Sequence, residues 1–156
     1  MNAPASKDDK KGAGRSARRR AREFALQGLY QWIVGGSDGP AIEAHLMEVE
    51  GFDKADRAHF REVLHGAIDQ ASELQALFSP FVDRELAQLS PVEHGILLLG
   101  TYELKARPEI PYRVVINEAV ELAKSFGGTD GFRYVNGVLD KVAGVLRPDE
   151  ARRPAH

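Results

Sequence analysis

Residues 90–100 read SPVEHGILLLG and contain the start and the centre of a predicted helix. Ser90 is a typical N-cap, the proline after it suits the first helical position, and Glu93 completes a capping box. The apolar run 96–99 places side chains on every side of the helix, which an exposed helix does not tolerate. The proline-containing segment 107–111 ends it. The stretch therefore predicts a helix surrounded by other helices.

On both sides of this segment, apolar residues recur at three- and four-residue spacing, the pattern of amphipathic helices. Glycines and prolines separate the repeats, and no sustained two-residue alternation bounded by hairpin turns occurs. The predicted fold class is all-α, with about seven helices. Besides the helix after Ser90, the expected helices are 16–34 with Ser16 as its N-cap, 40–50, 53–78, a short one after Pro80, 114–126, and a last one from Thr129 or Asp130 to 147.

Length and composition limit the domain organisation. A chain of 156 residues can bury one sizeable core, and we expect one helical domain over 15–148. Residues 1–14 are small, polar and charged, which predicts a disordered basic tail, and we expect a second tail over 149–156. No apolar run approaches the roughly 18–20 residues that span a bilayer. We therefore expect no membrane partner.

The residue types of enzymes and metal sites do not form recognisable patterns. The chain has no cysteine, which excludes disulfides and thiolate sites and favours a cytoplasmic location. Its five histidines show no metal-ligand spacing. The glycine-rich segment 127–131 has no preceding strand and fits neither phosphate-binding fingerprint, so we interpret it as a boundary between two helices. We expect no enzyme activity, no metal and no cofactor.

Positive charge is concentrated at the start of the first helix. Residues 1–22 carry eight positive and two negative charges, a net charge of +6, whereas the whole chain carries −2. The remaining residues 23–156 therefore carry −8. A short basic block of this kind typically meets a polyanion such as nucleic acid or an anionic membrane surface.

The arginines of this block share one side of the helix. A stripe beside the core face contains Arg15, Arg18, Arg19 and Arg22. We expect this stripe to stay in solvent, with Tyr30 next to it. The second half of the helix is apolar around most of its circumference and should be wedged between other helices, whereas the first half should protrude. Guanidinium groups bind phosphates and stack on bases, and exposed aromatic rings bind unstacked bases, so the combination favours single-stranded RNA.

Several blocks of sequence, taken in order, resemble the bacterial transcription antitermination family NusB. They are RRRARE at 18–23 with the following Ala25, Gln27, Leu29, Tyr30 and Trp32, then YEL at 102–104, PYRV at 111–114, INEAVELAKSFG at 116–127 and FRYVNGVLDK at 132–141. Two blocks are specific to this family, INEAVELAKSFG at 116–127 and YVNGVLDKVA at 134–143. The resemblance covers residues 16–148.

The resemblance implies a fold and a role without catalysis. It implies two three-helix subbundles that share the first helix. It also implies binding of single-stranded boxA RNA together with NusE, a protein of the small ribosomal subunit. The pair would join the RNA polymerase elongation complex with other Nus factors and suppress premature, particularly Rho-dependent, termination, notably in ribosomal RNA operons.

The family's site residues carry over to individual positions of this chain. Four arginines match its arginine-rich motif, and several further residues match positions at or near the RNA and NusE surfaces. The expected RNA-binding residues are Arg18, Arg19, Arg20, Arg22, Tyr30, Tyr112, Asp130 and Tyr134, and the expected partner-binding residues are Glu93, Tyr30 and Tyr134.

Two other classes of protein share single features with this sequence. A similar bundle precedes the catalytic domain of some ribosomal RNA cytosine methyltransferases, but no cofactor-binding segment follows in this sequence. A helix-turn-helix DNA-binding protein would carry base-reading side chains on a recognition helix after a tight turn. Here the basic residues lie at the start of the chain instead.

Overall fold

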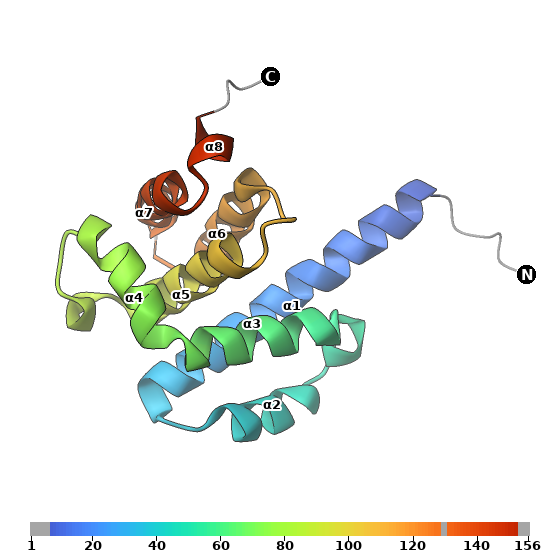
Figure 1. Ribbon diagram of the computed structural model, residues 1–156. Coiled ribbons are helices and arrows are strands. Elements are labelled where there is room, and N and C mark those ends of the chain that lie inside the picture. The colour runs from blue at the N-terminus through green and yellow to red at the C-terminus, as the bar shows by residue number, and fades with distance from the viewer. Residues whose placement is uncertain (1–6, 129–130, 153–156) are drawn as a thin grey trace, which may run out of the picture.

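The computed structural model describes residues 7–128 and 131–152, and these residues form helices and no strand. The all-α prediction is confirmed (Figure 1). Eight α-helices are described: α1 (Lys7–Gly35), α2 (Gly39–Met47), α3 (Arg57–Asp69), α4 (Ala71–Phe78), α5 (Pro91–Ala106), α6 (Tyr112–Phe126), α7 (Gly131–Leu146) and α8 (Pro148–Ala151). Short 3₁₀ turns lie at η1 (Phe52–Lys54), η2 (Ser79–Phe81) and η3 (Leu86–Gln88).

Helix α5 is the central element of the fold. Its residues 95–104 are all buried, and it packs against α1, α3, α4, α6 and α7. The Ser90 hydroxyl accepts a hydrogen bond from the backbone N–H of Glu93 at 3.1 Å and donates one to the Glu93 carboxylate at 2.9 Å. The predicted N-cap and the predicted burial of this helix on all sides are both confirmed.

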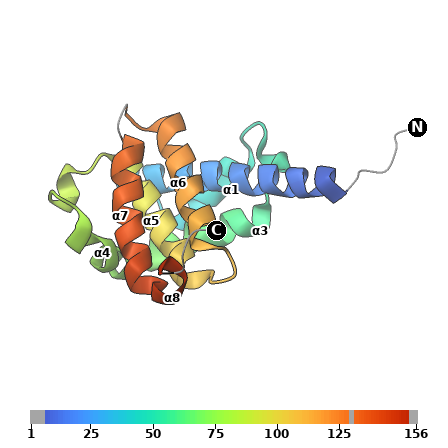
Figure 2. The same ribbon diagram turned by 90° about the horizontal axis from the view of Figure 1, so that it is seen from above.

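Helix α1 is wedged along its second half and projects along its first. It packs against α2, α3 and α5, and Leu26 and Leu29 are buried among these helices. Its first turns extend beyond the rest of the molecule, as Figures 1 and 2 show from two directions. The predicted arrangement of this helix is confirmed. The division into two subbundles that share α1 stays a prediction.

Helix α1 begins earlier than the sequence predicted. It starts at Lys7, so Ser16 lies inside the helix and the prediction that Ser16 is its N-cap is wrong. The segment between these residues contains lysine and arginine, which are good helix formers. The helix thus covers part of the segment expected as a tail, while the predicted domain limits themselves stay predictions.

The single helix predicted over 53–78 is wrong. The structure divides this segment into η1, α3 and α4, with a bend at Gln70, whose backbone leaves the helical region at φ −104° and ψ 15°. The side chain of Asp56 starts α3 by accepting a hydrogen bond from the backbone N–H of His59 at 3.1 Å. The bend directs α4 toward α5 and α7. Both halves keep apolar spacing, which is why the sequence pattern does not reveal the bend.

Helix α8 begins at Pro148, so helical structure continues into the segment that the sequence predicted as a second tail. Glu150 accepts a hydrogen bond from the backbone N–H of Tyr112 at 2.7 Å and another from Arg147 at 2.8 Å. Arg147 is buried and also donates to the backbone carbonyls of Leu104 and Ile110. This arginine ties the end of α7 to the end of α5 and positions α8.

Candidate nucleic-acid interface

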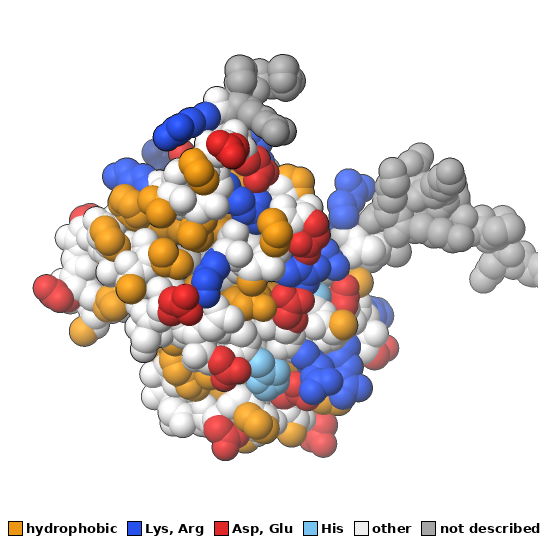
Figure 3. Space-filling view, viewed as in Figure 1, with side chains coloured by type: hydrophobic (Ala, Val, Ile, Leu, Met, Phe, Trp, Pro, Cys, Tyr) orange, Lys and Arg blue, Asp and Glu red, His pale blue; other side chains and the backbone are white. Residues whose placement is uncertain are grey.

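The basic end of α1 presents arginines to solvent. Arg15, Arg19 and Arg20 are exposed and Arg18 is half-buried. Figure 3 shows basic side chains interspersed with acidic ones on the side of the molecule from which α1 projects. The predicted exposure of the stripe is therefore confirmed for Arg15 and Arg19, whereas Arg18 is half-buried.

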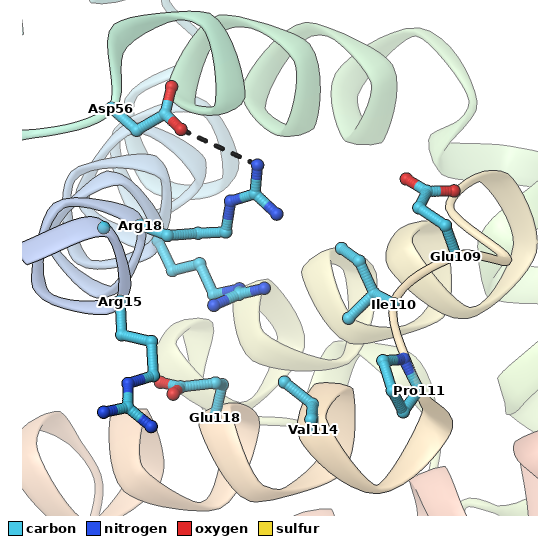
Figure 4. Close-up of a pocket in the computed structure, with 10 residues that line it drawn as sticks. Arg15, Arg18, Asp56, Glu109, Ile110, Pro111, Val114 and Glu118 are labelled. Carbon is cyan, nitrogen blue, oxygen red and sulfur yellow. Dashed lines mark ion pairs between the residues drawn. The ribbon is translucent and has the colours of Figure 1, made fainter. Parts of the chain in front are cut away.

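A groove of about 580 Å³ separates this part of α1 from the body. Figure 4 shows Arg15 and Arg18 reaching into it from α1, while Asp56 and Glu118 approach α1 from opposite sides. Arg18 Nη2 lies 3.7 Å from Asp56 Oδ2. Ile110, Pro111 and Val114 form an apolar part of the lining, which also includes Gly14, Arg22 and Glu109. The groove thus combines cationic donors with an apolar wall, a combination that suits the phosphates and the sugar or base of a nucleotide.

Arg19 lies in a second recess, of about 350 Å³, between α1 and α6. Its guanidinium donates two hydrogen bonds to Glu118, from Nε at 3.0 Å and from Nη2 at 3.1 Å. The hydrogen bond to Glu118 raises the pKa of Arg19 above its usual value. Arg15 and Ser16 complete the lining of this recess.

Arg22 does not belong to the exposed stripe, and the prediction that it stays in solvent is wrong. Its residue is only 3% exposed, and its guanidinium donates to Glu103 from Nε at 2.8 Å and from Nη2 at 2.9 Å. The ring of His59 contacts the same carboxylate through Nε2 at 3.0 Å. The α1–α5 contact covers this side of α1 one turn beyond Arg18. Arg22 therefore holds α1 to α5 from inside.

The carboxyl group of Glu103 is charged within this buried cluster. Burial raises the pKa of Glu103, but the hydrogen bonds from His59 and Arg22 and the positive charge of Arg22 lower it more, to about 2. The Nε and Nη2 donors of Arg22 are thus committed to the protein, while the residue also lines the groove beside α1.

Tyr30 lies in a different groove, of about 370 Å³, between α1, α5 and α6. Its side chain is 44% exposed, and Phe126, at the end of α6, is 42% exposed. Val92 lines the same groove, and Glu93 is the next residue along α5. Sequence reasoning missed Phe126 because it fits the helical pattern of α6. An aromatic residue directly before a glycine pair, at a helix end, is the signal that could have identified it.

Two other predicted aromatic residues lie outside these three grooves. Tyr112 is only 8% exposed, and its ring lies 5.3 Å from the guanidinium carbon of Arg113. Tyr134 is half-buried, and the guanidinium carbon of Arg84 lies 4.6 Å from its ring centre. Arg84 therefore already lies over the Tyr134 ring in a cation–π contact. Asp130 lies outside the described residues, as does the predicted helix cap at Thr129 or Asp130.

Across residues 7–128 and 131–152, no helix combines the length and the apolar character needed to cross a membrane. The described side chains contain no group of three or more His, Asp or Glu that could hold a metal ion.

Comparisons with known proteins agree with this architecture. The NusB family profile matches residues 19–144. The transcription antitermination protein NusB of Ralstonia nicotianae is 59% identical over 145 residues, which cover 92% of this chain and 94% of that protein. The structure is similar to that of T. maritima NusB, with a TM-score of 0.75, 29% identity and coverage of 97% and 98% of the two chains.

A second solved structure, of antitermination factors NusB and NusE in complex with double-stranded RNA, shares the fold with a TM-score of 0.74. It is 22% identical, and the match covers 83% of this chain and 98% of that chain. The resemblance inferred from the sequence blocks is thereby confirmed, and the chain belongs to the NusB family of transcription antitermination proteins.

Proposed function

We propose that this protein binds single-stranded boxA RNA together with NusE. On elongating RNA polymerase, with other Nus factors, the complex suppresses premature, Rho-dependent termination, notably in ribosomal RNA operons. The observation that carries the proposal is the exposed arginine face of α1, set on the fold of an antitermination family. A solved complex of the same fold contains NusE and RNA, which supports both partners.

Arg15, Arg18, Arg19 and Arg20 are the proposed RNA contacts on α1. Guanidinium groups grip phosphates bidentately, and Arg15 joins the set because it is exposed and lines both recesses beside α1. The apolar wall of the larger groove suits a base or ribose. Arg22 leaves the set, because it is buried and its Nε and Nη2 donate to Glu103. Further proposed RNA contacts rest on family resemblance alone, namely Tyr30, Tyr112, Asp130 and Tyr134.

The groove of Tyr30 and Phe126 is the proposed surface for NusE. It offers two exposed aromatic rings and is lined by Val92, the residue before Glu93, and family resemblance adds Glu93 and Tyr134 to the surface. Residues 23–156 carry a net charge of −8, which attracts a basic ribosomal protein, whereas the basic end of α1 attracts RNA. The two opposite charges thus steer two different partners to one molecule.

A gel-shift titration tests the proposal. A boxA-containing RNA oligonucleotide is titrated with the protein, with and without purified NusE, at fixed salt concentration. We expect a shifted band that appears at lower protein concentration when NusE is present, and we expect unlabelled single-stranded boxA RNA to compete better than duplex DNA of equal length. Equal competition by duplex DNA, or a band that NusE leaves unchanged, contradicts the proposal.

A further inference from the structure

Arg19 is already bound to a carboxylate in the absence of RNA. Glu118 accepts hydrogen bonds from Nε and Nη2 of the guanidinium, at 3.0 and 3.1 Å. This edge of the guanidinium is one that forms bidentate pairs with carboxylates and phosphates alike. The Arg19 side chain is 51% exposed, whereas that of Glu118 is 17% exposed. The carboxylate therefore covers one phosphate-binding edge of an otherwise accessible arginine.

The recess around this pair contains a second arginine. Arg15 lines it together with Arg19 and Glu118, and Arg15 forms no ion pair with any side chain that the structure describes. The three charged groups of the recess sum to +1, whereas the two arginines alone would give +2. An entering phosphate thus meets two cations and one carboxylate, and the carboxylate repels it.

Resting on the proposed RNA binding, we propose that Glu118 is an internal competitor of RNA phosphate for Arg19. An RNA phosphate takes the Nε and Nη2 donors of Arg19, and the carboxylate of Glu118 is released into solvent. Exposed ion pairs are weak, so RNA can displace this one, but the displacement still costs part of the binding free energy. Glu118 thereby lowers the RNA affinity that the arginines alone would give.

The competition also has a signature in the salt dependence. A phosphate contact to a free arginine releases a counterion from the RNA, and each such contact steepens the fall of affinity with salt. When RNA displaces Glu118, the freed carboxylate takes a cation back from solution. In the unsubstituted protein, the Arg19 contact therefore adds little to the slope of log affinity against log salt concentration. When residue 118 is neutral, the contact steepens this slope by the full amount of one phosphate contact.

The test replaces Glu118 by glutamine and measures affinity for a boxA-containing RNA oligonucleotide over a range of salt concentrations. We expect E118Q to bind about twofold to fivefold more tightly at low salt, as loss of an exposed ion pair allows. We also expect its plot of log affinity against log salt concentration to steepen by roughly 0.7, the value for one single-strand phosphate contact. The same titration in the R19A background should show no gain from E118Q.

Glu121 provides the matched control. It lies one turn further along α6, and E121Q removes the same charge without touching the bidentate contact. We expect E121Q to change affinity by less than E118Q. Equal effects of the two variants, or a gain from E118Q that persists in R19A, would mean that general charge acts and overturns the proposal. Weaker binding by E118Q also overturns it, since Glu118 would then position Arg19 for RNA.

The two proposals fail in different ways. Suppose that the protein binds boxA RNA and that alanine at Arg18, Arg19 and Arg20 weakens the binding. If E118Q then behaves like the unsubstituted protein, only the competitor role is wrong. If the arginine variants bind as the unsubstituted protein does, the proposed RNA site itself is wrong. Thermal unfolding of each variant checks that the helical fold is retained.

Discussion

At the scale of single residues, one arginine motif performs two tasks. Arg19 and Arg20 are exposed, whereas Arg22, two residues later, is buried against Glu103 and His59. We expect R22A to lower the free energy of unfolding by about 3–5 kcal/mol, because it leaves a buried carboxylate without its main partner. R20A should change it by less than about 0.5 kcal/mol, as exposed substitutions usually do. Urea unfolding of both variants measures the difference, and equal values would contradict the assignment.

The same cluster predicts how stability depends on pH. The pKa of Glu103 is lowered from 4.5 to about 2 in the folded protein. The unfolded chain therefore binds a proton more readily than the folded one below pH 4.5, so the stabilisation is present above that pH and is lost as the pH falls toward 2. We expect E103Q to be less stable at neutral pH and to show a shallower loss between pH 5 and 3. Urea unfolding at a series of pH values tests this, and an unchanged slope in E103Q would count against the assignment.

The burial of Arg22 also shows what sequence reasoning misses at this scale. A helical wheel places Arg22 on the same stripe as Arg15, Arg18 and Arg19, and nothing nearby in the sequence distinguishes it. Its partner Glu103 lies 81 residues away, on another helix. The exposure of Arg19 follows from local periodicity, but the pairing of Arg22 depends on how α1 crosses α5.

At the scale of elements, close helix contacts depend on glycine. A Cβ atom at Gly66 of α3 would overlap the ring of Tyr102 on α5, whereas Gly144 of α7 faces open space. We expect G66A to destabilise the protein by about 1–3 kcal/mol through overpacking. G144A should stabilise it by roughly 0.5–1 kcal/mol, because alanine favours the helix. Thermal unfolding separates the two, and a stabilising G66A would contradict the described α3–α5 contact.

Some helix boundaries are set by side chains next to them in the sequence, and others are set by packing against distant helices. The start of α5 follows from Ser90, whose hydroxyl accepts a hydrogen bond from the backbone N–H of Glu93 and donates one to the Glu93 carboxylate. The bend at Gln70 has no glycine or proline, and apolar spacing continues through it. It arises because α4 packs against α5 and α7. Caps are therefore predictable from sequence, whereas bends between packed helices are not.

At the scale of the whole molecule, charge is separated along the chain. The basic end of α1 projects from an acidic body, and the groove beside it contains Asp56 and Glu118 as well as arginines. The sequence predicted the separation and the family. It did not predict the paired carboxylates, because their positions depend on where α3 and α6 pass beside α1.

The central claim is that the exposed arginines of α1 bind boxA RNA. Its most direct test compares the triple variant R18A/R19A/R20A with a control that also loses three positive charges, R61A/K105A/K141A, on α3, α5 and α7. Affinity for a boxA-containing RNA oligonucleotide is measured at one fixed salt concentration. We expect the first variant to bind at least about tenfold more weakly and the control to stay within about threefold of the unsubstituted protein, because phosphate contacts are local. Equal losses in the two variants would contradict the claim.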